Sequence, residues 1–76
     1  MVKNTKYLAA NIKYLRTKRG LSQMELAKLL GVSQVAVAKY ETGQTMPETK
    51  NLIELSRIFK VTLDQLLKPM KGVNEK

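Results

Sequence analysis

Apolar residues recur along most of the chain at helical spacing, and strand signals are nearly absent. Leu8, Ile12 and Leu15 stand at positions i, i+4 and i+7, so they form one stripe of a helix. Asn4 or Thr5 can cap the start of that helix with a side-chain oxygen. The pattern therefore predicts an N-terminal helix with one face turned toward a core.

Capping residues mark the starts of further helices. Ser22 and Glu25 have the spacing of a capping box, as do Thr62 and Gln65. Ser33 is a third candidate N-cap. The helices predicted after the first one are therefore short: Ser22 to Leu30, Gln34 to about Thr42, about Thr49 to Lys60, and Thr62 to near Lys68.

Glycines and a proline mark the ends of these elements. Gly20, Gly31 and Gly43 each follow a helical stretch, where a residue with positive φ is often needed. Pro69 cannot continue a helix. We therefore expect an all-α, compact five-helix domain over residues 1–68 and a polar C-terminal tail over residues 69–76.

Composition limits the function classes. The sequence has 14 basic and 6 acidic residues, a net charge of +8, which favours an anionic polymer or surface as partner. A solvated, solubilising surface explains the charge equally well. No apolar run approaches the ~20 residues of a membrane span. We therefore expect a cytoplasmic, nucleoid-associated protein without a membrane partner.

The chain lacks the residues on which most catalytic sites depend. It contains no cysteine and no histidine, which removes disulfides, the commonest zinc ligands and the commonest general base. A chain of 76 residues also has little room for an enclosed active site beside its core. We expect no enzyme, no metal, no cofactor and no small-molecule ligand.

The stretch from Gln23 to Tyr40 is the most informative. Its two short helices are separated by only a few residues, so they must cross steeply. Ala27 is small enough for the crossing, and Gly31 suits the turn. The residues expected to share the core there are Leu26, Leu30, Val32, Val37 and Tyr40.

This stretch resembles the helix-turn-helix of the phage repressor and Cro-like DNA-binding proteins. The likeness extends from about Asn11 to Leu67. It rests on Arg16, the LSQ-x-x-LA run from Leu21 to Ala27, Gly31-Val32-Ser33, Glu41-x-Gly43, Pro47, and the pattern Phe59, Val61, Leu63 and Leu66. The resemblance implies a lambda-repressor-like fold in which the second and third helices form the motif. It also implies that the helix from Ser33 onward lies in the DNA major groove.

Side-chain chemistry agrees with that implied role. Gln34 can pair bidentately with adenine, and Val35 and Ala38 can meet thymine methyl groups. Lys39 can reach a phosphate or a guanine edge. Ser33 is mainly an N-cap, although its hydroxyl could also contact a base. These five residues are the candidate base contacts, while partial surface cover and helix propensity are the alternatives for Val35 and Ala38.

Other residues are candidate phosphate contacts. The resemblance implies that Gln23, at the start of the second helix, binds phosphate with its side chain and helix N-terminus. It implies backbone contacts for Gln44 and Thr45, in the loop after the third helix. Ser22 and Lys13 complete the candidate set. Such contacts would position the domain without reading sequence.

The resemblance also implies a salt bridge with a structural role, and the sequence departs from the family pattern at one position. It pairs Arg16 with Glu41 in a partly buried salt bridge, so we assign Arg16 to structure rather than to phosphate. In several phage repressors, the residue just after this proline is an arginine, and that arginine enters the minor groove. Here Glu48 follows Pro47, so that contact is not expected.

The sequence therefore predicts a dimeric transcriptional repressor on a pseudo-palindromic operator. In this family the fourth and fifth helices usually form the dimer surface, which points to the region around Phe59 to Leu67 and the segment after it. An antitoxin or protein-interaction helix-turn-helix module is the alternative. A chain complete at this length would look like a Cro-type regulator, whereas a longer one could carry a sensing domain beyond Lys76.

Overall fold

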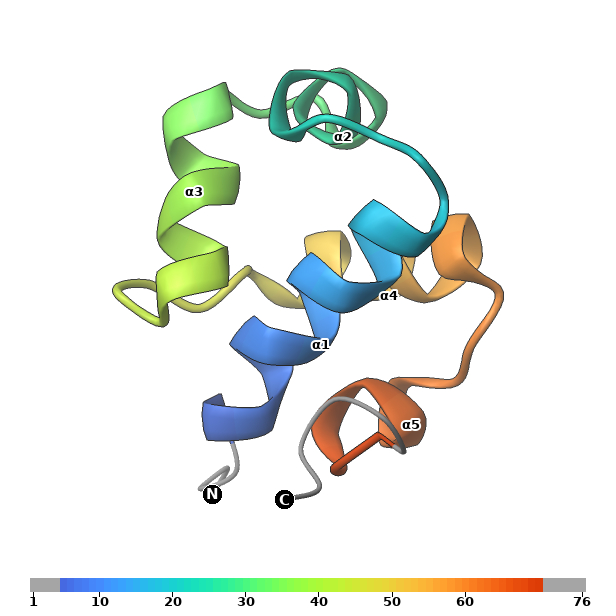
Figure 1. Ribbon diagram of the computed structural model, residues 1–76. Coiled ribbons are helices and arrows are strands. Elements are labelled where there is room, and N and C mark those ends of the chain that lie inside the picture. Colours follow the sequence, from blue (N-terminus) through green and yellow to red (C-terminus); the bar gives the residue numbers. More distant parts are fainter. Residues whose placement is uncertain (1–4, 71–76) are drawn as a thin grey trace.

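The computed structural model describes residues 5–70, which form five helices and no strand within that range (Figure 1). The helices are α1 (Thr5–Lys18), α2 (Gln23–Leu30), α3 (Gln34–Thr42), α4 (Thr49–Phe59) and α5 (Leu63–Leu67). α1 runs through the middle of the domain and packs against both α3 and α5. α3 stands at one edge of the molecule, on the opposite side from α5.

The predicted caps organise the helix boundaries. The Ser22 hydroxyl accepts the Glu25 amide at 3.0 Å, and the Glu25 carboxylate accepts the Ser22 amide at 2.8 Å. Thr62 and Gln65 form the same reciprocal pair at the start of α5. Gly31 ends α2 with φ 75°, a left-handed conformation that a glycine adopts without steric cost. The capping boxes and the glycine turn are therefore confirmed.

Two helix ends differ in detail from the prediction. α4 ends at Phe59, one residue early, because Lys60 takes the left-handed conformation with φ 58°. Thr5 is the first residue of α1, so only Asn4 of the two candidate caps precedes that helix. Asn4 lies outside the described residues.

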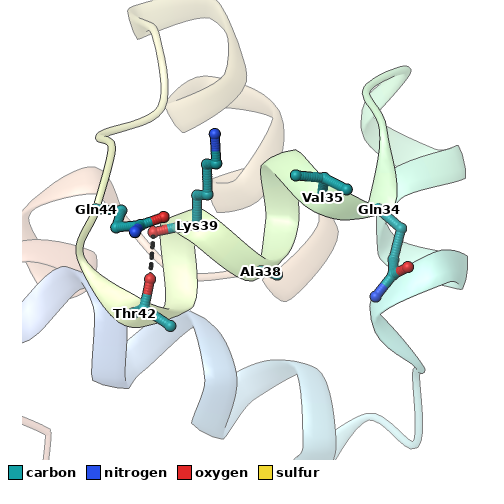
Figure 2. A pocket seen from close by; sticks show the side chains of 6 residues that line it. All are labelled: Gln34, Val35, Ala38, Lys39, Thr42 and Gln44. Atoms are coloured by element: carbon teal, nitrogen blue, oxygen red, sulfur yellow. Dashed lines mark hydrogen bonds between the residues drawn. The ribbon is translucent and has the colours of Figure 1, made fainter.

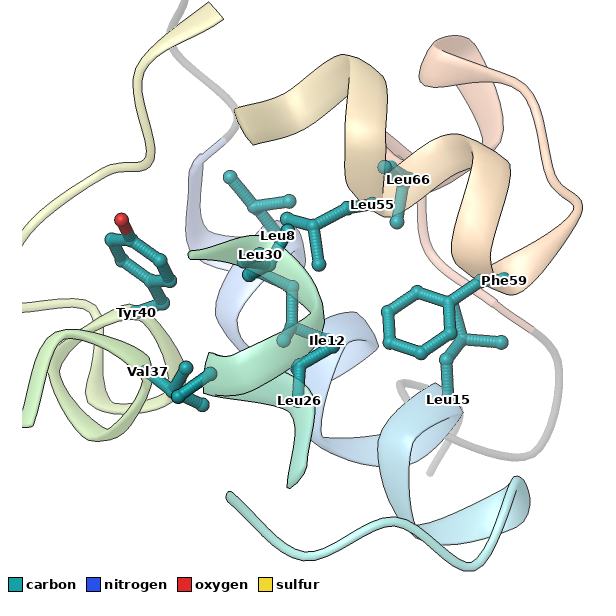
Figure 3. Packing of buried hydrophobic residues seen from close by; sticks show 11 residues of the cluster. Leu8, Ile12, Leu15, Leu26, Leu30, Val37, Tyr40, Leu55, Phe59 and Leu66 are labelled. Carbon is teal, nitrogen blue, oxygen red and sulfur yellow. The ribbon is translucent and has the colours of Figure 1, made fainter. Parts of the chain in front are cut away.

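The apolar stripes of all five helices meet in one core (Figure 3). Phe59, Ile12 and Leu26 are among its largest fully buried side chains. Ile53 departs from the apolar pattern of α4, because it is 39% exposed. Met70, expected in the C-terminal tail, is half-buried and packs against the core. The remaining tail residues, 71–76, lie outside the described part of the chain.

Two buried asparagines join elements that are distant in sequence. Asn11 is fully buried, and its Nδ2 donates to the carbonyl oxygens of Leu66 and Lys68, both at 2.8 Å. These bonds tie α1 to the end of α5. Asn51 of α4 lies 3.5 Å from the hydroxyl of Tyr40 in α3. Buried polar groups need such partners, so the two residues specify how the helices dock.

An ion pair joins α1 to the end of α3. Arg16 donates from Nε and Nη2 to the two carboxylate oxygens of Glu41, at 2.5 and 3.1 Å. Their side chains are only 11% and 3% accessible to solvent. Arg16 also donates from Nη1 to the Leu21 carbonyl at 2.8 Å. Because the geometry is bidentate and largely buried, loss of either partner would leave an uncompensated charge.

Glycine at the end of α4 should stabilise the domain. Lys60→Gly removes the steric cost of the left-handed backbone, and we expect a net gain of about 0.5–1 kcal/mol in unfolding free energy. Urea denaturation followed by circular dichroism measures it. Lys68→Gly is the control, since φ −109° at Lys68 gives glycine no advantage there. An equal gain in both variants would contradict the explanation.

Removal of one partner of the ion pair should destabilise more than removal of both. We expect Glu41→Leu to lower the unfolding free energy by about 3 kcal/mol, because the Arg16 guanidinium stays partly buried and unpaired. The double variant Arg16→Met, Glu41→Leu should recover part of that loss. The same denaturation experiment measures both. The single variant Arg16→Met completes the comparison. A double variant that loses the sum of the two single-variant losses would show that the two charges act independently.

Candidate nucleic-acid interface

α2 and α3 cross steeply after a tight turn (Figure 1). Ala27 of α2, which the sequence predicts to lie at the crossing, is 1% exposed. Its carbonyl accepts the amide of Val32 at 3.0 Å, which closes the turn after Gly31. The crossing directs α3 along the edge of the domain (Figure 1), where one side of the helix has no other element over it.

The two sides of α3 differ in chemistry. Val37 and Tyr40 face the core, with 0% and 8% exposure. The candidate base contacts lie on the other side, where Gln34, Val35 and Lys39 are exposed and Ala38 is half-buried. They line a hollow of about 360 Å³ together with Thr42 and Gln44 (Figure 2). The structure therefore brings four of the five candidate base contacts together on one surface.

Ser33 has a different place. It is exposed at the N-cap of α3, and its hydroxyl accepts the Ala36 amide at 3.1 Å. Its oxygen thus serves the helix start, and Ser33 does not line the hollow.

A hydrogen-bonded chain of side chains links the ion pair to the outward face of α3. Gln23, the first residue of α2, donates from Nε2 to Glu41 Oε1 at 3.1 Å. Its own Oε1 accepts Gln34 Nε2 at 2.8 Å. The sequence-based interpretation assigned Gln23 to phosphate alone and missed both contacts. No local signal could have shown them, because the residues are 18 and 11 positions apart.

Four of the five candidate phosphate contacts lie outside the hollow. Gln44 and Thr45 are exposed in the loop after α3, and Gln44 also lines the hollow. Ser22 is exposed before α2, with its hydroxyl occupied by the capping box. Lys13 is exposed on α1 and does not line the hollow.

The face of α3 presents no negative charge. Glu41 is the one acidic residue of that helix, and Arg16 and Gln23 occupy its carboxylate. The side chain of Lys39, the one basic residue of α3, is exposed to solvent. Among residues 5–70, no three acidic, histidine or cysteine side chains gather as a metal site would require. No helix in that range is long and apolar enough to cross a membrane.

Comparison with known proteins identifies relatives of the whole domain. The chain is 42% identical over 57 residues to YonR, an uncharacterized HTH-type transcriptional regulator from the SPbeta prophage of Bacillus subtilis. That match covers 75% of this chain and 53% of YonR. The chain is also 41% identical over 56 residues to the HTH-type transcriptional activator BcrR of Enterococcus faecalis. That match covers 74% of this chain and 28% of BcrR. The chain thus spans about half or less of these relatives.

A solved structure supports the same grouping. The c2 repressor of phage P22, crystallised with a synthetic operator, matches with a TM-score of 0.77 and 35% identity. The match covers 83% of this chain and 96% of that one. These relatives are named as regulators of transcription or as a repressor, which agrees with the expectation that the chain is not an enzyme. The helix-turn-helix family model matches residues 12–66. The chain therefore belongs to the helix-turn-helix family, as its resemblance to phage repressors predicted.

Proposed function

We propose that this chain is a sequence-specific double-stranded DNA-binding regulator that inserts α3 into the major groove. The observation that carries the proposal is the outward face of α3, where Gln34, Val35, Ala38 and Lys39 are gathered without any free carboxylate. The P22 relative, named as a repressor in complex with operator DNA, supports it by homology.

The dimensions of α3 suit the groove. Nine residues at about 1.5 Å each give a helix about 14 Å long and about 10–12 Å wide. The major groove of B-DNA is about 12 Å wide and admits one helix. Because α3 lies at the edge of the domain, it can enter the groove without collision from α4 or α5.

The contact between Gln23 and Gln34 favours base reading by Gln34. Its Nε2 uses one hydrogen for Gln23 and keeps the other, while its Oε1 remains an acceptor. A bidentate pair with adenine needs one donor and one acceptor, so Gln34 can form it while Gln23 holds the side chain. Ordering before binding reduces the entropy cost of the contact.

The remaining polar candidates fit phosphate contacts. Gln44 and Thr45 follow α3 directly, so they would lie beside the DNA backbone when the helix is in the groove. Gln23 keeps a second Nε2 hydrogen beyond the one given to Glu41. Lys13 on α1 would add charge that binds without reading sequence.

A symmetric operator would need two copies of the chain. The domain is 30 Å in its longest dimension, whereas successive major grooves on one DNA face lie about 34 Å apart. One copy therefore reaches one half-site. A dimer that covers a promoter would repress by excluding polymerase, and we propose repression as the outcome.

The proposed dimer surface is the region expected from the sequence, from the end of α4 through α5 and the segment after it. Phe59 and Leu66 are buried in the monomer core, so they cannot form it. Leu63 on α5 is 40% exposed, and a hollow of about 330 Å³ lies next to the end of that helix, lined by Val61, Gln65, Lys68, Pro69 and Met70. Burial of this apolar surface would favour pairing of two copies.

Selection of randomised duplex DNA on the purified chain tests the DNA-binding function. We expect a two-fold symmetric consensus that binds at least ~10³-fold more tightly than non-specific DNA.

Gln34→Ala should weaken binding by about 1–3 kcal/mol and relax the base preference at one position per half-site. Lys39→Ala should lower the affinity in the same titration, whereas Arg57→Ala, which removes the same charge from an exposed position of α4, should not.

Two salt concentrations separate the roles of Lys39. If Lys39 contacts a phosphate, Lys39→Ala should lower the affinity equally for all sequences and reduce the slope of log affinity against log salt by about 1. If Lys39 contacts a guanine, the variant should lose sequence preference at one base position. Weak binding without a consensus would contradict the regulator proposal and favour the protein-interaction module instead.

The dimer surface has its own test. We expect Leu63→Glu to prevent two chains from binding one symmetric duplex, because it places a charge within the apolar contact. Glutamate suits the first turn of a helix, so α5 should stay folded. Ile53→Glu, at 39% exposure on α4, is the matched control. Sedimentation of the DNA complex measures the stoichiometry, and normal pairing of the Leu63 variant would exclude this surface.

A further inference from the structure

A second hollow, of about 230 Å³, lies between the N-terminal half of α1 and the loop that follows α3. We call it the loop hollow, and its lining includes Ala9 of α1, Tyr40 of α3, and Gln44, Thr45 and Met46 of the loop. Gln44 also lines the hollow on the outward face of α3, so the two hollows are neighbours. The loop hollow therefore flanks the surface that we propose enters the major groove.

Tyr40 brings a buried phenol to the loop hollow. The residue is 8% exposed and belongs to the core, while its oxygen points away from the other core side chains (Figure 3). That oxygen accepts a hydrogen bond from Asn51 Nδ2 at 3.5 Å. Its own hydrogen is given to no acceptor within residues 5–70. Because a phenol both accepts and donates, the Tyr40 hydroxyl keeps one hydrogen for a group in the loop hollow.

The other lining residues make this a place for an oxygen-rich group with an apolar side. Gln44 and Thr45 add an amide and a hydroxyl that can donate, and no acidic residue lines the hollow. Ala9 and Met46 add apolar surface. A DNA backbone unit combines phosphate oxygens, which accept hydrogen bonds from such side chains, with the apolar carbons of deoxyribose. The volume exceeds that of several waters at about 30 Å³ each, so a phosphate group fits.

We infer that the loop hollow holds one phosphate of the DNA backbone and that the Tyr40 hydroxyl donates a hydrogen bond to it. The inference rests on the proposed DNA-binding function and adds to it a residue that the sequence pattern places in the core. Core packing fixes the ring of Tyr40 before DNA binds, which reduces the entropy cost of the contact. The contact fixes the position of α3 in the groove without reading a base.

Tyr40→Phe removes the hydroxyl and keeps the ring. We expect it to bind the selected duplex about tenfold more weakly per half-site, at the lower end of what a hydrogen bond to a charged group contributes. Base preferences should be unchanged. The slope of log affinity against log salt should also be unchanged, because an uncharged donor releases no counterion. Tyr14→Phe is the matched control, since Tyr14 is a half-buried tyrosine of α1 that does not line the loop hollow, and it should bind like the intact chain.

Single methylphosphonates in the same duplex separate a phosphate contact from a purely structural role of Tyr40. Each one replaces a charged phosphate oxygen by a methyl group at one backbone position. At one position per half-site, the intact chain should lose about tenfold more affinity than Tyr40→Phe loses, because the variant has no hydrogen bond there to lose. At all other positions the two proteins should show equal losses.

The outcomes are distinct. Equal losses at every position, or unchanged affinity of Tyr40→Phe, overturn the inference alone. If inorganic phosphate displaces DNA from the intact chain better than chloride does at equal ionic strength, and Tyr40→Phe abolishes that preference, the loop hollow takes a free anion and its assignment to DNA is wrong. Absence of any sequence-specific complex of the intact chain overturns the proposed function and the inference with it.

Discussion

The arrangement of the first three helices depends on the buried carboxylate of Glu41. It accepts hydrogen bonds from Arg16 of α1 and from Gln23 of α2, while it belongs itself to α3. Three helices are thus fixed to one buried group. Since a buried carboxylate is tolerated only with such partners, the constraint also limits how α2 and α3 can cross. Gln34 is attached to this centre through Gln23.

The same contact shapes the electrostatics of the domain. With Glu41 neutralised by Arg16, α3 keeps Lys39 as its net charge. Acidic side chains on α4 and α5 are paired within their own helices, Glu54 with Arg57 and Asp64 with Lys68. No free carboxylate on α3 itself therefore opposes the approach of a polyanion to that helix.

The sequence predicts local features of this fold well and tertiary polar contacts poorly. Capping boxes, the Gly31 turn and the apolar stripes act within a few residues, so their patterns are visible in the chain. Asn11 left a signal, because it lies on the apolar stripe between Leu8 and Leu15, yet its partners at the end of α5 are set by docking. The Gln23 contacts with Glu41 and Gln34, and the exposure of Ile53, likewise depend on how helices pack.

The composition of the α3 face limits how an operator can be read. Under the proposed function, Gln34 is the clearest candidate for a polar base contact. A good bidentate pair discriminates by about 1–3 kcal/mol, or about 2–6 kcal/mol over two half-sites. Specific sites are typically favoured by about 4–10 kcal/mol over non-specific DNA. Unless Lys39 reaches a guanine edge, the difference must come from groups without hydrogen bonds to base edges. Apolar contacts at Val35 and Ala38, and the cost of deforming DNA to fit two copies, are the contributions this surface leaves available.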